Sequence, residues 1–160
     1  MRIGVISDTH GHMERVKAAL EQMGEVDIIL HAGDHFRDVL LLQQTVTTPI
    51  IGVRGNCDFS GPREEIVQLD GINILLIHGH QYGVKGSLQR LAYRGAEAGV
   101  KVVVFGHTHI PEIEWSEDML LFNPGSIGSP RGASSHPTYG ILYLEEGKVH
   151  PVIEEVKATK

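Results

Sequence analysis

Histidine and aspartate recur in short motifs at five places along this 160-residue chain, and histidine is unusually frequent, at ten residues. The longest motif is VKVVVFGHTHIP, Val100–Pro111, in which an apolar, β-branched run stops at Gly106 and is followed by His107 and His109. The other four motifs are Asp8–His10 (DTH), Gly33-Asp34 (GD), Gly55–Asp58 (GNCD) and His78–His80 (HGH). Excess imidazole beside carboxylates indicates metal binding or proton transfer.

The donor types narrow the chemistry. The strongest candidate ligands carry oxygen or imidazole donors and no thiolate: Asp8, His10, Asp34, Asn56, His78, His107 and His109. Such a set suits Mn, Fe, Ni, Co or Zn better than an iron–sulfur cluster or Cu(I). Seven side chains exceed what one tetrahedral ion uses. A carboxylate shared between two ions would use them all, and two-metal sites hold their ions roughly 3.5–4 Å apart.

The elements that must position these motifs alternate in the first third of the chain. Apolar runs predict strands at Arg2–Ser7, Asp27–His31 and Thr48–Val53. Helical periodicity predicts helices at Glu14–Met23 and Arg37–Gln44. A β-α-β-α-β order implies parallel strands joined by right-handed crossovers.

Strands dominate the remainder. Asp70-Gly71 is a hairpin signal between Glu65–Leu69 and Ile72–His78, and a helix at Ser87–Ala98 precedes a buried strand at Val100–Phe105. Later strands are expected at Ile113–Trp115, Met119–Phe122, Thr138–Leu144 and Val149–Val156. The pattern predicts an α/β domain, spanning residues 1–160, in which two sheets pack face to face with helices outside.

Every polar motif follows a predicted strand. Ligands in α/β proteins bind beyond the carboxyl ends of strands, so the five motifs are expected to converge. Taken singly, Asp8 or Asp34 would more often be a turn or helix-cap residue. The coincidence of five strand ends favours a shared site. The segment Asn123–Pro137 is long for a loop in a compact domain, and long loops are usually functional.

Composition excludes several classes of function. The net charge is −6 and no basic stripe is present, which disfavours long nucleic acid as a partner. No apolar run approaches the ~18 residues of a membrane helix, and the N-terminal apolar run is too short for a signal peptide. The single cysteine, Cys57, cannot form an internal disulfide, so we expect a cytoplasmic protein.

In their order and spacing, DTH, GD, GNCD, HGH, GHTH and the NPGS of Asn123–Ser126 resemble the calcineurin-like metallophosphoesterases. The small bacterial and archaeal phosphodiesterase branch is the most similar part of that superfamily, and the resemblance covers nearly the whole chain. It implies a four-layer αββα sandwich of two mixed sheets, and a hydrolase of small phosphodiesters. It also implies two divalent transition-metal ions, Mn²⁺ first and Ni²⁺, Fe, Co²⁺ or Zn²⁺ as alternatives.

The same resemblance assigns roles to the candidate residues. It implies one ion held by Asp8, His10 and His109. It implies a second ion held by Asn56, His78 and His107, with Asp34 bridging the two. A metal-bound hydroxide would then attack phosphorus in line, because metal binding lowers the pKa of water toward ~7. Asn56 and the ions would neutralise charge on the phosphoryl oxygens.

One position departs from the wider superfamily, which usually has histidine where this chain has Cys57. That histidine is thought to protonate the leaving group, and a thiol with an unperturbed pKa near ~8.5 is a weaker donor. Cys57 is therefore either a poor acid or a small buried filler. Other candidates for substrate contact or support of the ligands are His12, Asp58, His80 and Arg131. We expect His31 to be a hydrogen-bonded core residue, and Tyr82, Trp115 and Tyr139 to pack.

Two alternatives remain open. A nuclease would use the same metals but lacks a basic track here. The chain also resembles the retromer subunit of this fold, at HGHQ, GHTH and NPGS, and that subunit works chiefly as a protein-binding platform. It is thought to have lost the bridging aspartate, whereas Asp34 is present here, which favours the enzyme. Apolar strand edges would suit a homo-oligomer.

Overall fold

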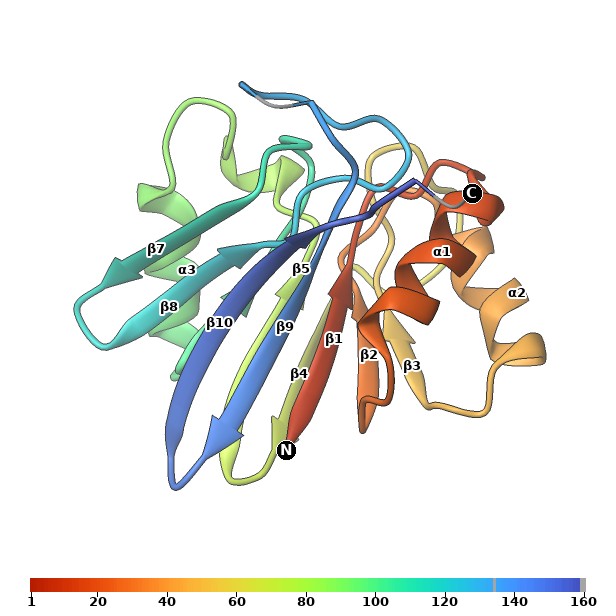
Figure 1. Ribbon diagram of the computed structural model, residues 1–160. Helices are drawn as coiled ribbons and strands as arrows, with labels where there is room; N and C mark the ends of the chain where they lie inside the picture. Colours follow the sequence, from red (N-terminus) through yellow and green to blue (C-terminus); the bar gives the residue numbers. More distant parts are fainter. Residues whose placement is uncertain (134, 159–160) are drawn as a thin grey trace.

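Two sheets stack face to face with helices on both outer surfaces (Figure 1). The computed structural model describes residues 1–133 and 135–158. Within these residues each sheet has five strands, and three α-helices flank them. The predicted four-layer αββα arrangement of two mixed sheets is confirmed. No helix of this described part is both long and apolar enough to cross a membrane.

The first sheet carries the β-α-β-α-β unit. Its strands, in spatial order, are β10 (Lys148–Glu155), β9 (Thr138–Glu145), β1 (Arg2–Ile6), β2 (Ile28–His31) and β3 (Ile50–Gly52). The last three run parallel, and α1 (Met13–Met23) and α2 (Phe36–Thr45) connect them. Because parallel neighbours need a crossover, both helices pack on the outer face of this sheet (Figure 1).

The second sheet is also mixed. Its strands, in spatial order, are β4 (Glu64–Leu69), β5 (Ile72–Ile77), β6 (Val102–Val104), β8 (Met119–Asn123) and β7 (Glu112–Ser116). The central three run parallel, and the two edge strands pair antiparallel with them. A 3₁₀ turn at His80–Tyr82 and α3 (Gln89–Ala98) connect β5 to β6, and α3 covers the outer face.

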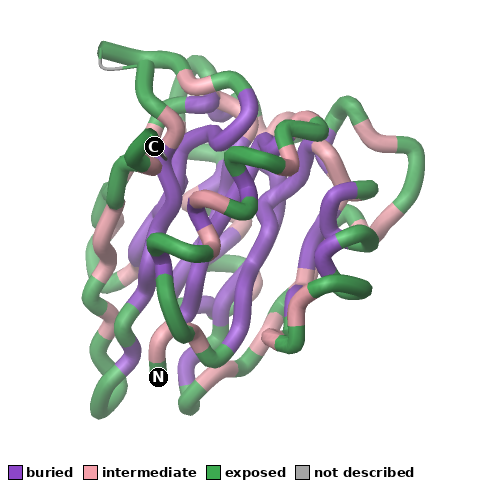
Figure 2. The backbone as a smooth tube through the Cα atoms, turned by 45° about the vertical axis from the view of Figure 1, so that its right-hand side comes forward, coloured by how far each residue is buried: buried purple, intermediate pink, exposed green. Residues whose placement is uncertain are grey.

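The main core lies between the sheets. Alternate residues of the central strands, such as Val5, Leu30, Leu76, Val104 and Phe122, are buried there. Burying such a side chain contributes roughly 1.5–3 kcal/mol. Figure 2 shows that the buried backbone runs through the interior of the sandwich, with exposed backbone around it. The edge strands β4, β7 and β10 are exposed or half-buried along their length. The core therefore fixes the strands as a rigid frame, and the loops at their ends take their positions from it.

Strand and helix bounds differ from the predictions by at most two residues at either end. The strand predicted to reach Ser7 ends at Ile6, and the one predicted to reach His78 ends at Ile77. Strand pairing stops at these points, directly before the polar motifs that follow the strands. Trp115, expected to pack, is half exposed because β7 is an edge strand.

Candidate metal centre

The five polar motifs meet at one end of the sandwich. Asp8, Asp34 and Asn56 follow the parallel strands β1, β2 and β3, which point to the same end (Figure 1). His78 follows β5 and His107 follows β6, in the other sheet. The two sheets therefore both supply side chains to a single cluster, as strand-end placement predicts.

Two carboxylates form the middle of the cluster. Asp8 Oδ1 lies 3.3 Å from His109 Nε2, 3.8 Å from His78 Nε2 and 3.9 Å from His10 Nε2. Asp34 Oδ2 lies 3.4 Å from His78 Nε2 and 3.9 Å from His10 Nε2. These separations are long for hydrogen bonds. They match donors around a shared ion, since ligands bound at about 2.0–2.2 Å lie roughly 3–3.5 Å apart.

The cluster has two halves. Donor atoms of Asp8, His10, Asp34 and His109 all lie within 4.8 Å of one another. In the other half, His78 Nε2 lies 3.0 Å from Asn56 Oδ1, and the rings of His78 and His107 have centroids 5.0 Å apart. The structure thus brings all seven predicted ligands to one end of the sandwich. The assignment of each residue to a particular ion stays a prediction.

Two buried atoms of the cluster lack any hydrogen-bond partner among the described residues, namely Asp8 Oδ1 and His10 Nε2. A buried, unpaired carboxylate oxygen is costly to leave without a counter-charge. Both atoms face other metal-type donors at distances that a divalent ion would span. The residues present therefore fit a bound metal.

The histidine rings are oriented by carbonyl oxygens. His78 Nδ1 donates to Ala32 O at 2.8 Å, and His109 Nδ1 donates to Ser129 O at 2.6 Å. A carbonyl only accepts, so Nδ1 carries the proton in both rings. In the neutral ring, which is the form that binds a metal, the lone pair is then on Nε2, and in each ring this atom faces the carboxylates. This arrangement is typical of metal-bound histidine.

The backbone at the ligands is strained. Positive φ angles occur at Asp8 (51°), His10 (45°), Asp34 (45°), His107 (72°) and His109 (63°). Such angles are uncommon outside glycine, and each costs of the order of 1–3 kcal/mol. Concentration of this strain at five candidate ligands indicates that the fold holds them in place for a function.

Two motif glycines are required by close packing. A Cβ on Gly55 would lie 1.9 Å from Asp34 Oδ1, and one on Gly106 would lie 2.2 Å from Ser7 Oγ and 2.6 Å from Asp8 Oδ2. No side chain fits at either place without displacing a carboxylate. The glycines in GNCD and GHTH therefore allow backbone to approach the ligands directly.

The electrostatic surroundings favour the ligating forms of Asp34 and His107. Burial raises the pKa of Asp34, but the hydrogen bonding and charge of His78 and the Cys57 backbone N–H outweigh it, so the pKa lies below its usual range. Burial lowers the pKa of His107 to about 4, helped by the positive charges of His78 and Lys85. Near neutral pH the carboxylate is therefore ionised and the His107 imidazole is neutral.

Asp58 has a clear structural part. Its Oδ2 accepts from the backbone N–H of Gly55 at 2.7 Å and of Asp34 at 3.2 Å, and its Oδ1 accepts from Phe36 N at 2.9 Å. One carboxylate thus links the loop after β3 to the loop after β2. Asp58 supports two ligand-bearing loops from behind.

Cys57 is exposed, so the interpretation of this residue as a buried filler is wrong. The residue follows Asn56, and its backbone N–H donates to Asp34 Oδ1 at 3.0 Å. Partial desolvation and the negative charge of Asp34 raise the pKa of the thiol. The thiol is therefore protonated near neutral pH.

The remaining candidates lie around the cluster. His80 is half-buried, with its ring centroid 5.4 Å from His78 and 6.0 Å from His107. His12 is exposed, directly before α1. Arg131 is also exposed, and its backbone N–H donates to His109 O at 3.0 Å. Of these three, His80 is the one whose ring lies beside two candidate ligands.

Several buried polar residues at the site were not found by sequence reasoning. Ser126 Oγ donates to Asp8 O at 2.8 Å, and Asn123 Nδ2 donates to Gly106 O at 3.1 Å. Both belong to the NPGS stretch, which connects the two sheets beneath the ligands. Thr9 and Asp38 form a further buried contact behind the DTH motif. The NPGS motif could have indicated Asn123 and Ser126, whereas no motif in the sequence indicates Asp38.

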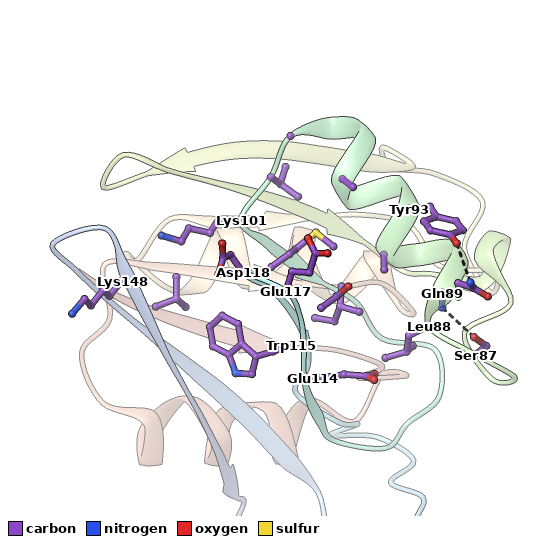
Figure 3. A pocket seen from close by; sticks show the side chains of 18 residues that line it. Ser87, Leu88, Gln89, Tyr93, Lys101, Glu114, Trp115, Glu117, Asp118 and Lys148 are labelled. Atoms are coloured by element: carbon purple, nitrogen blue, oxygen red, sulfur yellow. Dashed lines mark hydrogen bonds between the residues drawn. The ribbon is translucent and has the colours of Figure 1, made fainter.

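A groove lies away from the cluster. It has a volume of about 1330 Å³ and is bounded by α3, the β7–β8 hairpin and the start of β10, with Tyr93, Trp115 and Lys148 on its walls (Figure 3). None of the seven candidate ligands is among the described residues that line it.

Comparison with known proteins agrees with this geometry. Residues 1–147 match the calcineurin-like phosphoesterase superfamily domain. The chain is 38% identical over 148 residues to a probable metallophosphoesterase of Bacillus subtilis, covering 91% of this chain and 85% of that protein. It is 28% identical over 179 residues to a phosphodiesterase of Methanocaldococcus jannaschii, covering 97% of this chain and 100% of that protein.

Solved structures agree on the fold. The crystal structure of a predicted phosphoesterase from Streptococcus pneumoniae has a TM-score of 0.83 at 28% identity, covering 96% of this chain and 88% of that one. Zinc-bound Vps29 from Entamoeba histolytica has a TM-score of 0.74 at 19% identity, covering 98% and 100%, which is a likeness of fold alone. With the family match and the donor cluster, these findings show that the chain belongs to the calcineurin-like phosphoesterase superfamily, a family of hydrolases.

Proposed function

We propose that this chain is a binuclear metal-dependent phosphodiesterase that hydrolyses small phosphodiesters. The position of Asp34 carries the proposal. Its Oδ2 lies within 3.9 Å of His10 Nε2 in one half of the cluster and within 3.4 Å of His78 Nε2 in the other. A single carboxylate that faces histidines of both halves suits the bridge between two ions.

The proposed ligand sets follow the two halves. One ion would be held by Asp8, His10 and His109, and the other by Asn56, His78 and His107, with Asp34 shared. Oxygen and imidazole donors suit Mn²⁺ best, with Ni²⁺, Fe, Co²⁺ and Zn²⁺ as alternatives. When bound, two such ions supply a deprotonated water as nucleophile at neutral pH and charge neutralisation on the phosphoryl group.

The chain's own residues orient the substrate. Asn56 is exposed at the edge of the cluster, with its Oδ1 toward His78 and its Nδ2 3.7 Å from Cys57 Sγ. An amide N–H there can donate to a phosphoryl oxygen, which stabilises the charge that develops in the transition state. The rings of the neutral His107 and the half-buried His80 lie beside His78, with centroids 5.0 Å and 5.4 Å from its ring.

Charge supports a small substrate. The chain has a net charge of −6 and no basic track that would follow a polynucleotide backbone. One relative of this chain is named a phosphodiesterase. We therefore propose that the substrates are compact diesters and that one domain carries the reaction. We also propose a cytoplasmic location, because a lone exposed thiol stays reduced there.

A metal screen tests this proposal. The chelated protein would be supplied with each divalent ion and assayed on bis-nitrophenyl phosphate and on nitrophenyl phosphate. We expect turnover of the diester with Mn²⁺ and little turnover of the monoester. An Asp27→Asn variant, altered at an exposed carboxylate before β2 and away from the cluster, should match the wild type. Inactivity on both esters with every ion would favour the protein-binding role of the retromer type instead.

A further inference from the structure

Behind the DTH motif lies a buried chain of hydrogen bonds that joins three elements. Thr9 and His31 are fully buried and Asp38 is 2% exposed. Thr9 Oγ1 donates to Asp38 Oδ2 at 2.6 Å and lies 3.0 Å from His31 Nε2. Thr9 belongs to the loop after β1, His31 ends β2, and Asp38 lies in the first turn of α2. None of the three side chains belongs to the donor cluster.

Each group in this chain has a defined role. His31 Nδ1 accepts from the backbone N–H of Gly33 at 3.1 Å, so the proton of the neutral ring is on Nε2, which donates to Thr9 Oγ1. The Thr9 hydroxyl therefore accepts from His31 and donates to Asp38. Asp38 Oδ2 also accepts from the backbone N–H of Gly11 at 2.9 Å. The hydrogen bonds therefore have a single consistent direction, from His31 to Thr9 and from Thr9 to Asp38.

The backbone contacts bracket the candidate ligands. Thr9 lies between Asp8 and His10, and Gly33 directly precedes Asp34. These three ligands have the positive φ angles described above, and such backbone persists where the surrounding structure holds it. We infer that Thr9, His31 and Asp38 act as positioning residues, which hold the loops after β1 and β2 at the spacing that the metal ligands require. This inference rests on the proposed metal site.

Thr9 offers a matched pair of substitutions. Thr9→Val keeps the branched shape and removes the hydroxyl, whereas Thr9→Ser keeps the hydroxyl. Leu91→Ala is the control for general loss of stability, because Leu91 belongs to α3 and is fully buried where this helix packs on the outer face of the other sheet. Full-length chains would be compared by titration calorimetry with Mn²⁺ and by amide hydrogen exchange of the metal-free protein at Gly11 and Gly33.

We expect Thr9→Val to weaken Mn²⁺ binding by about 10–100-fold, as loss of a partner behind a metal ligand typically does, and to speed exchange at both glycines. Thr9→Ser and Leu91→Ala should keep wild-type affinity. The inference is overturned if Thr9→Val binds Mn²⁺ like Thr9→Ser, or if Leu91→Ala reproduces the loss. A wild-type chain that binds no divalent ion would instead reject the proposed function, and the exchange rates alone would then decide whether the network holds the loops.

Discussion

Asp34 and His78 face each other across the two sheets, with Oδ2 and Nε2 3.4 Å apart. Asp34 follows β2 in one sheet and His78 follows β5 in the other. The contact places a carboxylate of the first sheet against an imidazole of the second. Neither sheet could build the cluster alone, and the predictions below test what each side contributes.

Asp34→Asn should abolish turnover and leave the fold intact. The amide cannot act as a shared anionic ligand, so at least one ion should be lost, and circular dichroism should be unchanged. Elemental analysis of the purified variant checks the ion content against the Asp27→Asn control. Two ions per chain together with normal activity would refute the bridging role.

The two histidines of GHTH, His107 and His109, should bind different metal ions. His109 Nε2 lies 3.3 Å from Asp8 Oδ1, whereas the His107 ring lies beside His78, with centroids 5.0 Å apart. We expect His109→Ala and His107→Ala to empty different positions in manganese-soaked crystals, measured by anomalous scattering. His150→Ala, on the exposed side of β10, should keep both positions filled. Loss of the same ion in both variants would show that the assignment is wrong.

Gly55→Ala should weaken metal binding although alanine is a small change. The added Cβ would lie 1.9 Å from Asp34 Oδ1, so the carboxylate must move. Gly86→Ala is a fair comparison, because its Cβ would meet its nearest neighbour, Gly83 O, at an ordinary 3.7 Å. Calorimetric titration with Mn²⁺ should show a loss of at least about 10-fold for Gly55→Ala alone. Equal affinities for the two variants would contradict this packing argument.

The metal-free protein should lose stability as pH falls from 7 toward 4, in part through His31. Burial lowers the pKa of His31 to about 4, whereas the unfolded value is 6.5, so protonation favours the unfolded chain. The stabilisation is complete above pH 6.5 and declines until about pH 4, by on the order of 3 kcal/mol. Urea unfolding in EDTA across this range should show a shallower decline for His31→Gln. If the free energy of unfolding declines equally with pH in the wild type and in His31→Gln, His31 does not contribute to the loss of stability.

Cys57 predicts a preference among leaving groups. Its thiol is exposed, and its raised pKa makes it a poor proton donor. Nitrophenyl esters leave without protonation and should react well, while alkyl esters should be slow, since a positioned acid is worth roughly 10²–10⁴-fold. Cys57→His should then raise kcat/KM for alkyl esters and change nitrophenyl rates little. Equal losses on both substrates in Cys57→His and Cys57→Ala would defeat the leaving-group argument.

Much of this arrangement could be predicted from the sequence, because the strands and the motifs after them are both local patterns. Asp8, Asp34 and His78 were found as residues that follow apolar runs. His31 was expected to be a hydrogen-bonded core residue, and its contacts with Thr9 and Gly33 confirm this.

Other contacts depend on how distant elements pack. Asp38 was an ordinary residue of a predicted helix, and its contact with Thr9 exists only because α2 lies over the loop after β1. The exposure of Trp115 likewise follows from the place of β7 at the edge of its sheet. Strand order and helix placement are set by the whole core, and no short window of sequence contains them.

The joint origin of the ligands has a consequence for the lifetime of the protein. The candidate ligands follow β1, β2 and β3 of one sheet and β5 and β6 of the other. Ions bound among them would clamp the two halves of the sandwich together, and occupancy at 100 times Kd adds about 2.7 kcal/mol to the free energy of unfolding. Cells short of metal would then hold a population that opens and is degraded more readily. The abundance of the protein would follow the metal supply without any regulator of its synthesis.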